Sequence, residues 1–190
     1  MSRFGIIVEG PCDASVYSAM IPRIRPEIAD VVARACGGVP ALTNRFVGLL
    51  KHFQYMDRID KALVIRDSDR RDPQVVEKGL RDRLDESGFR PTFPVHFYAT
   101  KSMVETWLLA DINAIVKTAR GRGHSGSVKP MNRTLEEIID PKAAFHAMLS
   151  QAGLPADPKV YGEIATEADI DIIEGCCPYF LKFREHIHAC

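Results

Sequence analysis

Short, continuous apolar runs alternate with longer amphipathic stretches through the first half of the chain. The runs predict strands of a parallel sheet covered on both faces, and they lie within residues 3–10, 31–36, 62–69 and 92–99. Between them, helical spacing of apolar residues predicts helices from Asp13 to about residue 24, over 41–55 and over 74–87. Four βα units with right-handed crossovers predict a parallel sheet between two layers of helices.

The pattern changes after residue 100. Helices without intervening strands are predicted at residues 103–117, 134–139, 141–152, 161–173 and 178–187. We therefore predict an α/β core over residues 1–111 and a helical appendage over residues 112–190 that packs on one edge of the sheet, rather than a second independent domain.

The third predicted strand ends in two carboxylates, Asp67 and Asp69, with one residue between them. Side chains at i and i+2 of a strand point to the same side, so both carboxylates can aim at one point beyond the strand's carboxyl end. Open α/β sheets bind ligands there. Close carboxylates repel each other unless a cation is supplied, and Mg2+ takes oxygen ligands. A metal site and a solvated acidic turn are the two interpretations of this stretch.

The first predicted strand also ends in an acid, Glu9, which Gly10 follows. For Glu9 to lie near Asp67 and Asp69, strand one must neighbour strand three, with strand two outside it. This arrangement gives the order 2-1-3-4 of flavodoxin-like sheets, whose ligand crevice lies between strands one and three. We therefore expect a three-layer α/β fold in which these acids share one site.

Composition narrows the class of protein. A chain of 190 residues with 46% hydrophobic residues can build a core and is too apolar for disorder. The balance of 25 basic and 25 acidic residues argues against a generally basic surface that coats nucleic acid. No apolar stretch approaches the roughly 20 residues of a membrane span, and no secretion signal is evident. The five scattered cysteines fit a reducing compartment, so we expect a cytoplasmic protein with no membrane partner.

With these acids at these strand ends, the first ~110 residues resemble a Toprim domain. Toprim domains are catalytic modules of topoisomerases, bacterial primases and overcoming-lysogenization-defect nucleases. Beyond the core, the chain is similar to an uncharacterised Toprim-like prokaryotic family related to those nucleases. The motifs that carry the resemblance are Val8-Glu9-Gly10, Asp13, Asp67-Ser68-Asp69, Glu105 to Asp111, Pro141-Lys142 and Cys177 to Phe180.

The resemblance implies Mg2+- or Mn2+-dependent phosphodiester chemistry on DNA or RNA by a nuclease. It implies Glu9 as a general acid/base or metal ligand, and Asp67 and Asp69 as metal ligands. We expect neither a topoisomerase nor a complete primase, because these 190 residues contain no topoisomerase tyrosine domain and no primase zinc module. The resemblance also implies a partner ATPase, in phage defence or DNA repair.

Two further acids are candidate metal ligands. Some relatives carry a third aspartate at the position of Arg71, and Asp72 is the nearest substitute here. Asp72 fits equally well as the cap of a helix that begins at Pro73. Glu105 is the second candidate, and its alternative is a solvated carboxylate in the first turn of a helix.

Basic residues after the fourth strand are candidate contacts for nucleic acid. Lys101 directly follows that strand, and Arg120, Arg122 and Lys129 lie in a glycine-rich stretch over residues 120–130. Such residues suit a phosphate backbone, which is read by charge. They equally suit a solvated surface loop.

The end of the chain is rich in cysteine and histidine. Its spacing fits no common zinc pattern, so we expect Cys176 and Cys177 to be core residues at the start of a helix. The cysteine and histidine residues of this end of the chain are Cys176, Cys177, His186, His188 and Cys190.

Two other function classes compete with the nuclease. A phosphoacceptor receiver shares the strand order, but its strand one ends in an acidic pair, whereas Glu9 here is followed by Gly10. A non-catalytic binding module of an ATPase complex would keep the same acids for folding or for its partner.

Overall fold

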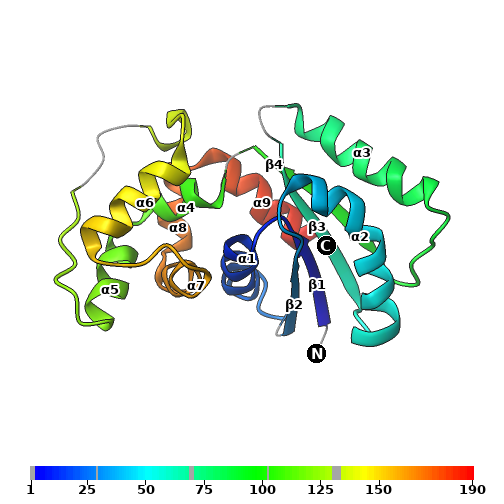
Figure 1. Cartoon of the computed structure of the whole chain (residues 1–190), viewed down its shortest axis with the longest axis horizontal. Helices are drawn as coiled ribbons and strands as arrows, with labels where there is room; N and C mark the ends of the chain where they lie inside the picture. Colours follow the sequence, from blue (N-terminus) through cyan, green and yellow to red (C-terminus); the bar gives the residue numbers. More distant parts are fainter. Residues whose placement is uncertain (1–2, 29, 69–70, 102, 130–133) are drawn as a thin grey trace.

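A four-stranded parallel sheet forms the centre of the molecule (Figure 1). The computed structural model describes residues 3–28, 30–68, 71–101, 103–129 and 134–190. The sheet has the order β2-β1-β3-β4, which confirms the predicted α/β fold and its strand order. Its strands are β1 (Arg3–Val8), β2 (Asp30–Ala35), β3 (Lys61–Asp67) and β4 (Val95–Thr100).

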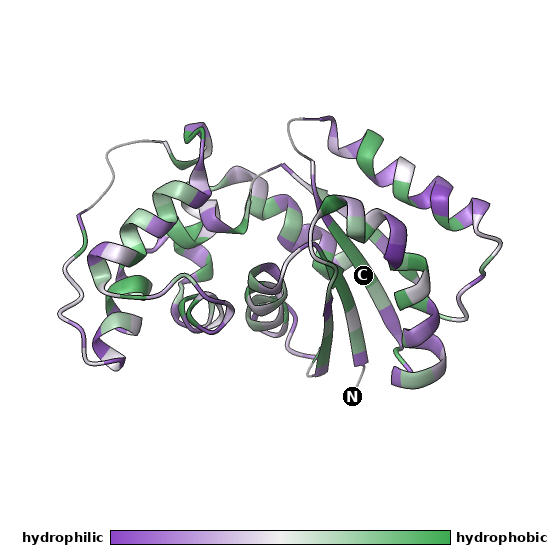
Figure 2. Cartoon of the chain, viewed as in Figure 1, coloured by the Kyte–Doolittle hydropathy of each residue, from purple (hydrophilic) through white to green (hydrophobic). Residues whose placement is uncertain are grey.

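Helices cover both faces of the sheet. On one face lie α2 (Val39–His52) and α3 (Pro73–Glu86), and on the other lies α1 (Pro11–Ile24) (Figure 1). Apolar residues fill the strands (Figure 2), and alternate positions pack on opposite faces, with Ile6 toward α1 and Ile7 toward α2. This two-sided burial explains why the strands are continuous apolar runs in the sequence.

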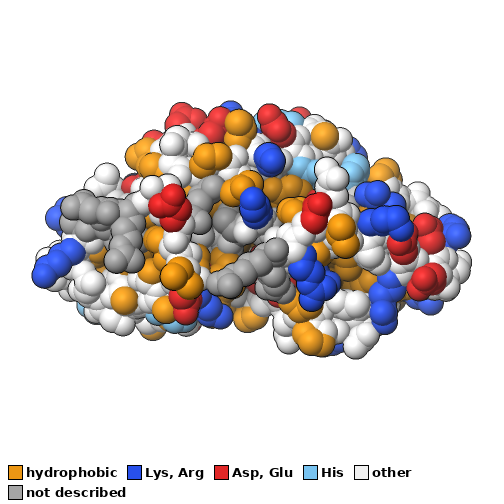
Figure 3. All heavy atoms as spheres, turned by 90° about the horizontal axis from the view of Figure 1, so that it is seen from above, with side chains coloured by type: hydrophobic (Ala, Val, Ile, Leu, Met, Phe, Trp, Pro, Cys, Tyr) orange, Lys and Arg blue, Asp and Glu red, His pale blue; other side chains and the backbone are white. Residues whose placement is uncertain are grey.

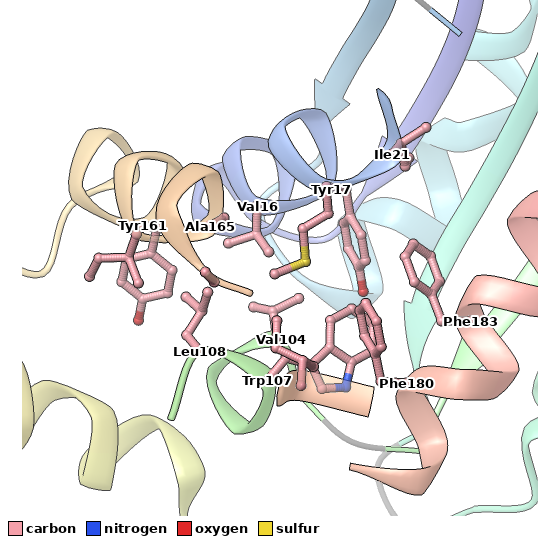
Figure 4. Close-up of a cluster of buried hydrophobic side chains, with 14 of the residues drawn as sticks. Val16, Tyr17, Ile21, Val104, Trp107, Leu108, Tyr161, Ala165, Phe180 and Phe183 are labelled. Carbon is pink, nitrogen blue, oxygen red and sulfur yellow. The ribbon is translucent and has the colours of Figure 1, made fainter. Parts of the chain in front are cut away.

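The second half of the chain is helical and packs against α1 and the edge strand β4. Side chains of α1, α4, α7 and α9 converge in one hydrophobic cluster, with Trp107 between Tyr17 and Phe180 (Figure 4). This cluster also includes strand residues of β1 and β3, so it spans the predicted boundary after residue 111. The helices are α4 (Val104–Ala110), α5 (Ile112–Gly121), α6 (Pro141–Ala152), α7 (Pro158–Glu167), α8 (Ile170–Cys176) and α9 (Pro178–Ala189), with a 3-10 turn at Leu135–Glu137.

Two helices predicted as continuous are each broken in the structure. The predicted helix over 103–117 is two helices that meet at Asp111, whose buried carboxylate accepts hydrogen bonds from the amides of Asn113 and Ala114 (3.0 and 3.3 Å). Asp169 similarly begins α8, so the predicted helix over 161–173 is also wrong. An aspartate side chain that accepts hydrogen bonds from the backbone amides following it caps the start of a new helix. The spacing of apolar residues does not reveal such a break.

Among the described residues, no helix combines the length and the apolar character that crossing a membrane requires.

Candidate acidic site at the strand ends

The ends of β1 and β3 are held together by Glu9. Its Oε1 accepts a hydrogen bond from the backbone amide of Asp67 at 3.0 Å. Its backbone carbonyl accepts two more, from the amides of Gly37 and Gly38 at 2.7 and 2.9 Å. Both glycines have φ near +100°, a backbone conformation that residues other than glycine rarely adopt. The turn after β2 therefore fixes the backbone of Glu9 at the end of β1, beside the end of β3.

Asp67 is the last residue of β3 and lies opposite Thr100 of β4. It shares the strand face of Leu63 and Ile65, which pack toward α1. The structure thus brings Glu9 and Asp67 to the same edge of the sheet, as the strand order requires. Asp69 lies outside the described residues.

Asp13 adds a third carboxylate. The first helix, predicted to begin at Asp13, already begins at Pro11, with Gly10 as its N-cap. Asp13 occupies the third helical position and accepts a hydrogen bond from the amide of Gly10 at 2.8 Å. Burial raises the pKa of Asp13 from 3.8 to about 6, and the nearby Glu105 carboxylate adds to the rise, although the Gly10 bond and Lys142 oppose it.

Glu105 is buried in α4, with only 5% of its surface exposed, so the interpretation as a solvated helix terminus is wrong. Its Oε1 accepts a hydrogen bond from the Tyr161 hydroxyl at 3.1 Å, and that hydroxyl lies 3.0 Å from Nε2 of His146. Burial raises the pKa of Tyr161, and the Glu105 carboxylate raises it further, so the phenol stays protonated and donates. Sequence reasoning missed Tyr161 and His146, because their separation from Glu105 along the chain follows no local period.

Tyr17 lies within electrostatic reach of three of these acids. Burial raises its pKa, and the carboxylates of Asp67, Asp13 and Glu105 each raise it further. We call Glu9, Asp13, Asp67 and Glu105 the acidic cluster. Its members come from the ends of β1 and β3, the first turn of α1 and the first turn of α4.

The donor type of the acidic cluster suits a hard divalent cation such as Mg2+ or Mn2+, although among the described residues no three of its carboxylates lie within 4.8 Å of one another. All its donors are carboxylate oxygens, which such ions prefer. The raised pKa of Asp13 marks a carboxylate whose charged form is poorly compensated, and a bound cation would compensate it. Beside Asp67, the buried Ser68 hydroxyl makes no hydrogen bond to the described residues and is a further free oxygen.

Asp72 is the N-cap of α3. Its side chain accepts a hydrogen bond from the amide of Gln74 at 2.9 Å, and Pro73 is the first residue of the helix. The cap interpretation is confirmed, since one carboxylate oxygen is committed to the helix start.

Lys101 lies in a basic and aromatic pocket beside the end of β4. Its Nζ contacts the ring of Tyr179 at 4.6 Å from the centroid, and Nζ of Lys182 lies 5.6 Å from the same centroid. Lys101 also donates a hydrogen bond to the Tyr179 hydroxyl. We call Lys101, Tyr179 and Lys182 the basic pocket; they line a space of about 370 Å³ whose lining also includes two carboxylates, Asp72 and Glu77. Figure 3 looks onto this end of the sheet, where Lys and Arg side chains lie beside Asp and Glu.

The basic stretch over residues 120–130 lies elsewhere. Arg120 belongs to α5 and not to a loop, and α5 stands at the end of the molecule far from the sheet (Figure 1). Arg122 forms an ion pair with Glu163, with Nε and Oε2 2.7 Å apart. Lys129 is exposed. Part of the charge predicted to meet nucleic acid is therefore used within the helical appendage.

The fold and the site define a parallel three-layer α/β protein with an acidic cluster at the carboxyl ends of its central strands.

No protein-family model matches the chain, and no curated protein matches it in sequence. Two solved structures align with nearly the whole chain. The C-terminal region of the Xanthomonas campestris pv. campestris OLD protein is 14% identical, with a TM-score of 0.47 and coverage of 98% of this chain and 94% of that one. The C-terminal region of the Burkholderia pseudomallei OLD protein is 18% identical, with a TM-score of 0.46 and coverage of 100% and 98%. Similarity at this level does not establish membership of a family.

Proposed function

We propose that this chain is a metal-dependent nuclease of the Toprim type, which cleaves phosphodiester bonds of DNA or RNA. The observation that carries the proposal is the hydrogen bond from the Asp67 amide to the Glu9 carboxylate, which unites the two acidic strand ends. The buried carboxylate of Glu105 and the partly buried carboxylate of Asp13 support it, because acids gathered near strand ends suit the binding of a cation and a phosphate better than they suit folding.

In this proposal Glu9, Asp67 and Asp69 hold Mg2+ or Mn2+, with Glu105 as a further ligand. The ion supplies charge neutralisation for a phosphodiester. Glu9 takes a proton from the attacking water, which a carboxylate does well when it stays ionised. Tyr161 donates to Glu105 and so fixes the direction in which that carboxylate faces.

The basic pocket is the proposed contact for the nucleic-acid backbone. Lys101 and Lys182 offer positive charge beside the acidic strand ends, and Tyr179 offers a ring on which a base can stack. A partner ATPase and a cytoplasmic location belong to the same proposal, with the resemblance of the motifs as their support.

A cleavage assay tests the proposal. The full chain is incubated with plasmid, single-stranded DNA and RNA in Mg2+, Mn2+ or EDTA. We expect metal-dependent cleavage that Glu9→Gln lowers by roughly 100-fold or more while nucleic-acid binding persists, because the substitution keeps the shape and removes the proton acceptor. Glu185→Gln is the matched control, since Glu185 is exposed on α9 and outside the acidic cluster; it should cleave like the wild type.

Two results would reject the nuclease. Absence of cleavage with every metal, together with loss of partner association in Glu9→Gln, would identify a non-catalytic module. Formation of an acyl phosphate on Asp67 during incubation with acetyl phosphate would identify a receiver.

A further inference from the structure

A second group of chemically active side chains lies away from the acidic cluster, where α9 packs on β4. His96 comes from β4, and His186 and Cys190 come from the end of the chain. A nitrogen of each imidazole and the Cys190 sulfur all lie within 4.8 Å of one another. We propose that these three side chains bind a zinc ion that fastens α9 to the edge strand of the sheet.

The ligand types and their spacing suit zinc. Two imidazoles and one thiolate are ligands that Zn2+ prefers, and Mg2+ takes oxygen ligands instead. With Zn–N of about 2.0–2.1 Å and Zn–S of about 2.3 Å, ligand atoms of a tetrahedral site lie roughly 3.3–3.7 Å apart. From separations of up to 4.8 Å, the donor atoms therefore need to close by at most roughly 1.1–1.5 Å, within the reach of side-chain rotation. A water molecule completes the fourth position.

The Nε2 atom of His186 is an independent sign of a missing ligand. It is buried and makes no hydrogen bond within the described part of the chain. Buried polar atoms are nearly always paired, because an unpaired one loses its hydration without compensation. The ring of His186 lies 6.1 Å from that of His96 and nearly perpendicular to it, and a nitrogen of each ring lies within 4.8 Å of the Cys190 sulfur.

Burial favours the liganding form of the two imidazoles. Burial lowers the pKa of both His96 and His186, so both rings are neutral near pH 7 and keep a lone pair for the ion. Burial raises the pKa of the Cys190 thiol to about 11, although Arg25 and Lys61 oppose the rise, so the thiol is protonated near pH 7 and has to lose its proton to bind the ion. On binding, the thiol proton passes to solvent and the sulfur bonds the metal.

The proposed zinc site is separate from the acidic cluster. His96 is the second residue of β4, and Thr100 at the other end lies four positions further along the strand, a distance of about 13 Å. The Lys61 ammonium donates a hydrogen bond to the Cys190 carbonyl, so the end of α9 is already held against the start of β3. A metal here would stabilise the packing of α9 without taking part in chemistry at the strand ends.

Cobalt substitution and thermal unfolding test the proposal on the full chain, without an affinity tag. We expect one equivalent of Co2+ to give a thiolate-to-cobalt absorption band, and Zn2+ to raise the melting temperature because it binds only the folded state. Cys190→Ser should lose the band, and His96→Gln and His186→Gln should lose the Zn2+-dependent rise. The matched controls are Cys176→Ser and His188→Gln, which alter exposed residues in the same part of the chain and should behave like the wild type.

Three results would overturn the zinc site. The first is a wild-type cobalt complex without the thiolate band, and the second is a band that survives in Cys190→Ser. The third is an equal rise in melting temperature with Zn2+ in wild type and in His96→Gln, which is the fallback variant if Cys190→Ser does not fold. Nuclease activity is not a readout here, so failure of the zinc site leaves the proposed function untouched.

Discussion

At the scale of single residues, the ionised Asp13 carboxylate of the acidic cluster lowers the stability of the folded protein. Asp13 is partly buried beside Glu105, and burial raises its pKa to about 6. Its hydrogen bond from the Gly10 amide compensates only part of that cost. Titratable groups with pKa values shifted in this way are common at functional sites.

The raised pKa of Asp13 predicts a pH dependence of stability in EDTA. Because the folded-state pKa exceeds 3.8, the folded protein binds more protons than the unfolded chain between pH 3.8 and about 6. The contribution of Asp13 to stability therefore falls as pH rises through that window and stays low above it. Asn can still accept the bond from Gly10, so Asp13→Asn should be more stable than wild type at pH 8 by about 1–3 kcal/mol.

Chemical denaturation at pH 4 and pH 8 measures this difference. The advantage of Asp13→Asn should shrink toward zero at pH 4, where the wild-type carboxyl is protonated in the folded state. Glu105 and Lys142 face the same group, so both residues are left unchanged in the comparison. An advantage that is the same at both pH values would contradict the assigned titration.

At the scale of elements, the π-helical turn Phe53–Asp57 packs so closely on β1 that no side chain fits at Gly5. A Cβ added to Gly5 would lie 2.6 Å from the Phe53 ring and 3.1 Å from Ile59. Phe53 is fully buried at this point, so the ring has little freedom to move. The close approach of the turn to the sheet therefore requires glycine in the middle of a strand.

We expect Gly5→Ala to lower the free energy of unfolding by about 1–3 kcal/mol through overpacking. Gly48→Ala is the matched control, because Gly48 is exposed in α2 and its added Cβ meets nothing within 4 Å. That change should be neutral or stabilise by up to about 1 kcal/mol. Urea unfolding of the two variants measures both effects, and an equal response would show that Phe53 relaxes freely.

At the scale of the whole molecule, the acidic cluster exists because the two halves of the chain meet. The sheet contributes Glu9 and Asp67, the first helix contributes Asp13, and the helical half supplies Tyr161, which orients Glu105. The basic pocket is assembled in the same way, with Lys101 after β4 and Tyr179 from α9. The face around the strand ends is therefore the part of the surface we expect nucleic acid to contact.

Salt dependence distinguishes this face from the stretch over residues 120–130. Replacing Lys101 and Lys182 by Gln should make the dependence of log K on log salt shallower by about two phosphate contacts. Replacing Arg120 and Lys129 by Gln alters the same number of charges at the far end of the helical half and should leave the slope nearly unchanged (Figure 1). Fluorescence anisotropy with a labelled oligonucleotide over a salt series measures both slopes. A larger change in the second pair would assign binding to the stretch over 120–130.

The sequence by itself determined the sheet, its strand order and the meeting of Glu9 with Asp67. The physical reason is that strand patterns are local, right-handed crossovers restrict topology, and parallel strands end at one common edge. The cap formed by Asp72 was also predictable from the sequence, since it depends only on the residues that follow it.

Only the tertiary structure decided which distant residues join these sites. The hydrogen bond between Glu105 and Tyr161 connects residues 56 positions apart. The group of His96, His186 and Cys190 joins a strand of the sheet to the end of the chain. Spacing within the Cys/His-rich end could not reveal His96, and Cys176 is exposed where a core position was predicted. Local periodicity reports which face of an element is apolar, whereas the packing of one element on another decides which polar side chains meet.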